Sequence, residues 1–422
     1  ATAKSKATAI EGGGGDDLIT SSGDLTATAN SDAVALAVGV GKKTDENSSA
    51  KTKVDAKAVA EATATGIAGD GGIDDTSRSV TVNIDDNGLL VEYVDQKTAA
   101  TGDDEITNSG AVTSDATATS GAVAVAVTID GAARADANSA ATAKAAGVDT
   151  GAGSDFIDNS GALQVDAAAT SSTLNVAVTS DGRAVTNAGL MDGGNKADAN
   201  AVGINSGGGE YQKSTTVTGF IDFNNIGVDA RYEGISDSLS GDGADTITNS
   251  ESINASSFAL APEVTAGITG EGLAVSIGRR QTMATASAIQ SGNLGDSIDN
   301  SGDLVVDASS TAVLANVAVT GKGLAVATNA VWDGGTKAEA SANGIDADSG
   351  SMTSKVVSAK ANRDIAYVRY NDEFQAASGD DQVINSGQID ATSFALAPSL
   401  NVAIDLGKEN KTGLAAAVST SS

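Results

Sequence analysis

The chain has 422 residues, including 50 glycines and two prolines, with no cysteine or histidine and a formal charge of −30. The lack of cysteine and histidine excludes disulfides, thiol nucleophiles, serine–histidine triads and histidine-ligated zinc or iron. The acidic charge disfavours nucleic acids and anionic membranes as partners and favours cations. No segment approaches the roughly 18 consecutive apolar residues of a membrane span, so membrane insertion is not predicted.

The hydrophobic residues are mostly small. Aromatic residues make up 3% of the chain, and alanine and valine supply most of its 40% hydrophobic fraction. This composition is typical of a thin core that repeats many times. An acidic, cysteine-free chain rich in glycine and alanine also suggests a bacterial surface protein. We therefore expect an extracellular or cell-surface location, with targeting signals outside these residues.

Strands are predicted along the chain by apolar residues with a period of two. The clearest runs are AVALAVGV at 33–40, GAVAVAVTIDG at 121–131, TLNVAVTSDGRAV at 173–185 and AVLANVAVTGKGLAVAT at 312–328. Alanine-rich runs such as DATAT at 115–119 have some helix propensity, but their alternation with polar residues favours strands. Small residues on the inward face would let two layers lie close together. The pattern predicts an all-β fold, a repetitive β-solenoid of the parallel β-helix or β-roll kind.

A D-x-I/V triplet recurs six times, and its spacing reveals alternating long and short units. The aspartates are Asp17, Asp104, Asp155, Asp245, Asp296 and Asp381, separated by 87, 51, 90, 51 and 85 residues. One long and one short unit form a super-repeat of about 140 residues. We expect one continuous array over 1–422, with units 17–103, 104–154, 155–244, 245–295, 296–380 and a truncated 381–422. Such a chain would be a window of a longer array or a protomer docked end to end with others.

The long units contain extra segments of roughly 35 residues, at about 69–100, 206–240 and 347–377, by comparison with the short units. Eight of the twelve aromatic residues lie there or at their edges: Tyr93, Tyr211, Phe220, Phe223, Tyr232, Tyr367, Tyr370 and Phe374. A thin alanine core has no room for such side chains. We therefore predict lateral hairpins or flaps, with these aromatic residues as candidate interaction sites.

The stretch GGGGDDLIT at 12–20 resembles the calcium-binding nonapeptide of RTX β-rolls, with Asp17 as the aspartate and Ile19 as the large apolar residue. In that family glycines turn the backbone, while aspartate and carbonyl oxygens bind a calcium ion. The resemblance implies calcium as a cofactor at Asp17, Asp155 and Asp245, and by repetition at Asp104, Asp296 and Asp381.

The same residues also fit a purely structural corner, in which aspartate and asparagine form turns and the apolar residue returns the chain to the core. Asparagines recur four residues after the aspartate at Asn108, Asn159, Asn249, Asn300 and Asn385, which suits a ladder or simple turns. One wide coil per unit would place successive motifs about 4.8 Å apart. We expect two or three narrower coils per unit, which would separate the motifs by roughly 10–15 Å.

No catalytic centre is predicted, so the chain is not expected to be an enzyme. Acidic pairs such as Asp16–Asp17 and Asp103–Asp104 are repeated and flanked by glycine, whereas a glycosidase needs one pair in a unique cleft. A lyase would need a basic residue, and the one adjacent arginine pair, Arg279–Arg280, is expected to be solvated at the surface. A polysaccharide-acting solenoid enzyme is the remote alternative.

Over nearly its whole length the chain resembles the repeat regions of giant bacterial surface proteins, namely RTX-type adhesins and filamentous-haemagglutinin-like β-solenoids. The resemblance implies a structural or adhesive extracellular rod or filament segment, stiffened by calcium, whose partners are copies of itself or further repeats of the same protein. The alternative is a carbohydrate-binding repeat array with surface polysaccharide as partner. It requires an exposed aromatic pair in every flap, and the first flap has only Tyr93.

Overall fold

The computed structural model describes residues 1–42, 50–70, 73–85, 88–99, 102–151, 153–187, 194–207, 212–222, 227–235, 243–292, 295–329, 335–347, 351–361, 366–376, 380–407 and 414–418. Within these ranges all regular structure is β, arranged as three sheets of 13, six and six strands. The predicted all-β solenoid with lateral hairpins is confirmed. The described residues contain no helix with the length and apolarity needed to cross a bilayer.

Each coil of the solenoid begins with a short corner strand that carries the D-x-I/V motif. The six corner strands stack in parallel, in the order β2 (Leu18–Ser21), β7 (Glu105–Asn108), β9 (Phe156–Asn159), β14 (Thr246–Asn249), β17 (Ser297–Asn300) and β22 (Gln382–Asn385). Their isoleucines align, so that Ile157 lies between Ile106 and Ile247 in the register. In the first five coils this isoleucine is at most 8% exposed, so it holds the corner in the core.

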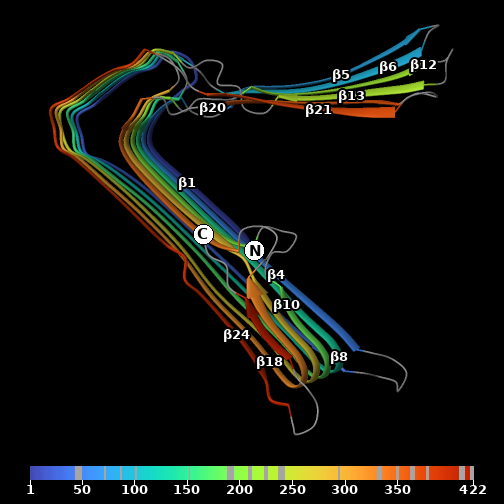
Figure 1. Cartoon of the computed structure of the whole chain (residues 1–422). Helices are drawn as coiled ribbons and strands as arrows, with labels where there is room; N and C mark the ends of the chain where they lie inside the picture. The colour runs from blue at the N-terminus through green and yellow to red at the C-terminus, as the bar shows by residue number, and fades with distance from the viewer. Residues whose placement is uncertain are drawn as a thin grey trace.

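Two long arms follow each corner and meet at a tip (Figure 1). The first arm runs from corner to tip and contains β3 (Leu25–Gly41), β23 (Ile389–Leu396), β24 (Ser399–Asp405) and the first parts of β8 (Val112–Asp149), β10 (Leu163–Asn187), β15 (Ile253–Gly278) and β18 (Leu304–Asn329). The second arm returns from the tip through the later parts of these four strands and through β1 (Thr2–Gly13), β4 (Ala50–Asp70), β11 (Asn195–Asn205), β16 (Arg280–Gln290), β19 (Thr336–Asp346) and β25 (Leu414–Val418).

Each sequence unit forms a single wide coil, and the expectation of two or three narrow coils per unit is wrong. Strand β8 pairs residue by residue with β10 of the next unit from Val112↔Leu163 to Ala135↔Thr186. In β8 the two arms and the tip between them form one continuous strand of 38 residues, with the tip as its one sharp turn. Because nothing divides the arms into shorter strands, the motifs of successive units become direct neighbours.

The interior between the arms is lined mainly by alanine. In the second coil Ala122, Ala124 and Ala126 of the first arm and Ala133 and Ala135 of the second arm are all at most 1% exposed. The tip column is glycine: Gly131, Gly182, Gly272 and Gly323 have φ between +117° and +138°. A Cβ there would lie 1.9–2.1 Å from a carbonyl oxygen of the preceding coil, so both conformation and space require glycine.

The three insertions are hairpins that join into one antiparallel sheet beside the solenoid (Figure 1). Its strands, in spatial order, are β5 (Ile73–Asp85), β6 (Gly88–Ala99), β12 (Gln212–Asp222), β13 (Gly227–Ile235), β20 (Ser351–Ala361) and β21 (Ala366–Ala376). Neighbouring hairpins pair directly, as in Val217↔Tyr93 and Tyr232↔Val357.

Strand spacing explains why the hairpins occur in alternate units. A hairpin is two strands wide, or about 10 Å, and two coils of the solenoid advance by the same distance. A hairpin in every coil would require twice as much sheet width as the solenoid provides. The alternation of long and short units therefore matches the hairpin sheet to the rise of the coils.

Candidate functional site

The structure brings the six predicted aspartates into one column at the corner. Each aspartate immediately precedes a corner strand, and the parallel register aligns them. Asp104, Asp155, Asp245 and Asp296 are 1% exposed, whereas Asp17 and Asp381 at the two ends of the column are half-buried.

Hydrogen bonds run the length of this aspartate column. The backbone N–H of Asp17 donates to Oδ1 of Asp104 at 2.9 Å, and Asp104 donates in the same way to Asp155. The pattern continues to Asp245, Asp296 and Asp381, each at 2.9 Å. One carboxylate oxygen per coil is therefore already occupied by a backbone donor of the adjacent coil.

The second carboxylate oxygen points toward small residues at the end of the second arm. An added Cβ on Gly12 would lie 2.6 Å from Oδ2 of Asp17, and one on Gly69 would lie 2.0 Å from Oδ2 of Asp104. Neither of these Oδ2 atoms accepts a hydrogen bond. Burial raises the pKa of Asp104 to about 6 and that of Asp245 to about 8. Of these two carboxyl groups, Asp245 is therefore mainly protonated at neutral pH.

The predicted asparagines form a second, parallel column. Nδ2 of Asn108 donates to Oδ1 of Asn159 at 2.8 Å, and Asn159 donates to Asn249 at 2.7 Å. The ladder continues through Asn300 to Asn385, at 2.7 and 2.6 Å. Each Nδ2 also donates to the carbonyl two residues further on, such as Gly110 for Asn108. This asparagine ladder both closes the turn and joins the coils, which combines the two predicted roles.

Calcium prefers six to eight oxygen ligands. Among the residues that the structure describes, no three acidic side chains converge in a way that could hold a metal ion. The column contributes one Oδ2 per coil, since Oδ1 accepts a backbone N–H. One available carboxylate oxygen per coil suits a hydrogen-bonded corner better than a calcium site with six to eight oxygen ligands. Calcium binding at the six aspartates stays a prediction.

Six of the predicted aromatic residues lie on hairpin strands, and Tyr211 and Phe223 lie outside the described residues. Phe220, Tyr367 and Phe374 are on β12 and β21. Tyr93, Tyr232 and Tyr370 occupy one register row across the sheet, alternating with Val80, Val217 and Val357. The hairpins thus repeat in register, as the coils do. Whether these residues bind a partner stays a prediction.

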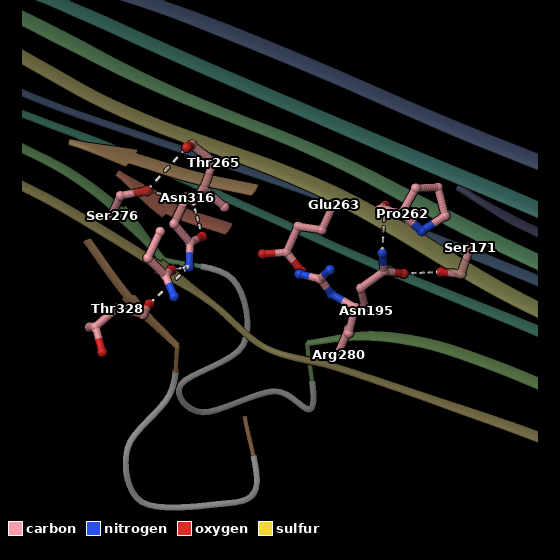
Figure 2. A network of polar contacts seen from close by, with 10 residues as sticks. Ser171, Asn195, Pro262, Glu263, Thr265, Ser276, Arg280, Asn316 and Thr328 are labelled. Carbon is pink, nitrogen blue, oxygen red and sulfur yellow. Dashed lines mark hydrogen bonds and ion pairs between the residues drawn. The ribbon is translucent and has the colours of Figure 1, made fainter. Parts of the chain in front are cut away.

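A buried ion pair was not predicted. Arg280 was expected at the surface, but Arg280 and Glu263 are fully buried between the arms, with 3.7 Å between Nη2 and Oε2. Figure 2 shows the two side chains directed toward each other. Burial raises the pKa of Glu263 to about 7 and lowers that of Arg280 to about 10. The available signal was the period of two, because Arg280 alternates in phase with the inward Thr282 and Ala284.

Polar contacts around this pair tie the arms together (Figure 2). Asn195 of the second arm donates to the carbonyl of Pro262 in the first arm at 3.0 Å. The hydroxyl groups of Thr265 and Ser276 meet across the interior, and Asn316 donates to the carbonyl of Thr328 at 3.0 Å. In the third to fifth coils, polar contacts between the arms therefore replace part of the alanine interior, and a different set of residues makes them in each coil.

Comparison of the chain with protein-family models, curated proteins and solved structures returned no match.

Proposed function

We propose that this chain is a structural, non-enzymatic segment of an extracellular rod or filament on a bacterial surface. The observation that supports this proposal most strongly is the in-register stacking of six coils along one axis. Backbone hydrogen bonds between parallel strands point from coil to coil, and the aspartate column and asparagine ladder run in the same direction. Tension along the axis would therefore load many bonds together.

Open strand edges support growth by further coils or copies. Within the described residues β3 pairs only with β8, while β23 and β24 pair only with β18. A strand edge that has no partner strand pairs readily with another parallel strand. Further repeats of the same protein or copies of this chain would extend the solenoid in the same register.

Scattering from tandem copies tests the rod. Two copies joined head to tail should lengthen the particle by about 29 Å, six coils at about 4.8 Å each, with an unchanged cross-section. Small-angle X-ray scattering of one, two and three copies measures both quantities. Copies that behave as separate beads on a string would contradict the proposal. Antibody labelling of intact cells of the source organism tests the surface location.

Calcium stiffening, which the RTX resemblance implies, needs a separate test. Thermal unfolding is followed by circular dichroism with calcium, with magnesium and with a chelator at constant ionic strength. Specific binding at the aspartate column would raise the midpoint with calcium alone, and Asp155→Asn would remove the shift. An equal response to both ions would assign the effect to screening of the −30 charge.

A further inference from the structure

The outer surface of the first arm is aliphatic. In six aligned segments, 36–40, 123–127, 174–178, 264–268, 315–319 and 400–404, the first, third and fifth residues point outward. Every one of these residues is valine, leucine, isoleucine or alanine. Leu36, Val264 and Leu400 are 71%, 45% and 60% exposed. We call these eighteen positions the aliphatic face.

Nothing in the described fold requires large aliphatic residues at these positions. The inward neighbours are small, as in Ala122, Ala124 and Ala126 behind Val123, Val125 and Val127. The larger side chains therefore remain on the solvent side of the sheet. The hairpin sheet does not cover them, because it extends from the opposite side of the coil (Figure 1). A contiguous exposed apolar patch of this kind marks an interaction surface.

The aliphatic face has the size of an interface. Strand spacing of about 4.8 Å and a rise of about 3.3 Å per residue give roughly 550 Å² for six strands and three outward residues each. Two such faces in contact would bury about 1,100 Å², which is above the roughly 1,000 Å² expected of a specific interface.

The residues that border the aliphatic face are also arranged as in a protein interface. None of the eighteen positions is charged, although the whole chain carries −30. Toward the corner the outward rows become polar, first at Asp32, Thr119, Thr170 and Thr311 and then at Asp115, Asp166 and Asp307, and at the tip lie Asp130, Asp181, Glu271 and Lys322. An apolar centre with a charged border is typical of protein interfaces. The acidic border disfavours nucleic acid and anionic bilayers as the occupant.

We propose that the aliphatic face is covered by the same face of a second copy, so that two solenoids pair side by side. Both partners then present flat ladders with identical spacing along and across the strands, and such ladders can interdigitate as in sheet-on-sheet packing. The strand edges at the ends of the coils stay free for axial growth. The inference rests on the proposed rod function and adds the surface through which rods would bundle.

Pairing brings two acidic borders together, so the association constant increases with salt. Screening weakens the repulsion between the borders, while contact between the aliphatic faces persists. An association held mainly by surface charge pairs would show the opposite dependence.

Sedimentation velocity at about 1–100 µM protein, in low and high salt, tests the inference. We expect a monomer–dimer equilibrium in the wild type, and a loss of dimer affinity of roughly tenfold or more in Val176→Lys at the centre of the face. The matched control is Thr285→Lys, which adds the same charge to the outer surface of the second arm. The side chains of Val176 and Thr285 both point outward. Circular dichroism spectra of the two variants check that they fold.

A wild type that remains monomeric at high salt, or a Val176→Lys variant that dimerises as strongly as the control, would overturn the inference. Because the chain lacks cysteine, Val176→Cys labelled with pyrene provides a second measurement, with excimer emission expected on pairing and none from labelled Thr285→Cys. Tandem copies separate the two proposals. Long particles of single width would refute pairing alone, whereas paired particles that fail to lengthen would refute the rod.

Discussion

The two arms have similar interiors and opposite outer surfaces. Both bury columns of alanine, but the first arm presents the aliphatic face, while the second arm presents paired charges such as Lys53–Asp55, Arg134–Asp136 and Lys196–Asp198 at 2.7, 3.5 and 2.5 Å. Exposed pairs of this kind contribute little stability, although they keep a surface hydrated. The inward residues therefore determine the fold, and the outward residues distinguish a solvated surface from a contact surface.

The largest effect is expected where the two arms share a buried charge pair. Glu263→Gln leaves the Arg280 guanidinium without its counter-charge between the arms, which should lower the free energy of unfolding by about 3–5 kcal/mol. Equilibrium denaturation measures this loss. In Glu263→Gln combined with Arg280→Met no buried charge remains, so part of the stability should return. Equal losses of unfolding free energy in the single and double variants would show that the charges of the pair do not contribute and that only its packing matters.

The difference between the inner and outer residues of one arm is tested by adjacent substitutions in β8. Ala126→Leu inserts three carbon atoms into the thin interior and should destabilise the chain by about 1–3 kcal/mol. Val125→Leu adds one carbon on the aliphatic face and should change stability by less than about 0.5 kcal/mol. Denaturation midpoints at low protein concentration, where pairing is absent, give both values. Similar losses would mean that the outer face is packed in the monomer.

The corner, from which both arms start, should make the free energy of unfolding fall as the pH rises from about 4 to about 8. Burial raises the pKa of Asp245 from its ordinary value of 3.8 to about 8 in the folded chain. Below about pH 4 both states bind the proton. As the pH rises from about 4 to about 8, the unfolded chain releases it first, so stability falls, and it levels off above about pH 8.

We expect this fall to exceed about 1.4 kcal/mol, which corresponds to one pKa unit. Asp245→Asn keeps an acceptor for the N–H of Asp155 and should flatten the dependence. Urea denaturation between pH 4 and pH 9 measures it. A profile that is unchanged in Asp245→Asn would show that the titration occurs elsewhere in the chain.

The smallest effect is expected on the solvated arm. Lys196→Ala removes the pair with Asp198, and its lysine is half exposed at 50%. The expected loss is at most about 0.5 kcal/mol, decreasing further in high salt. Chemical denaturation at two salt concentrations checks this value. A larger, salt-resistant loss would indicate that the second arm also carries a contact surface.

Much of this architecture could be predicted from local sequence. The period of two in GAVAVAVTIDG identifies a strand with small residues on one side, and the structure places the last residue of this stretch, Gly131, at the tip. Regular spacing of Asp17 and its five counterparts identifies the corner, and the length difference between units identifies the hairpins. These features depend on short-range geometry, namely strand pleat and turn conformation, which a few neighbouring residues determine.

The repeat spacing and the period of two are enough to predict a repetitive β-solenoid with acidic corners and lateral insertions. The three-dimensional fold was needed to show that each unit is one wide coil, so that Asp104 and Asp155 are neighbours although 51 residues separate them. The fold also brings Arg280 to Glu263 and leaves the valines of the first arm on its outer surface. The physical reason is that these relations depend on the separation of the arms, which results from the packing of all inward side chains together.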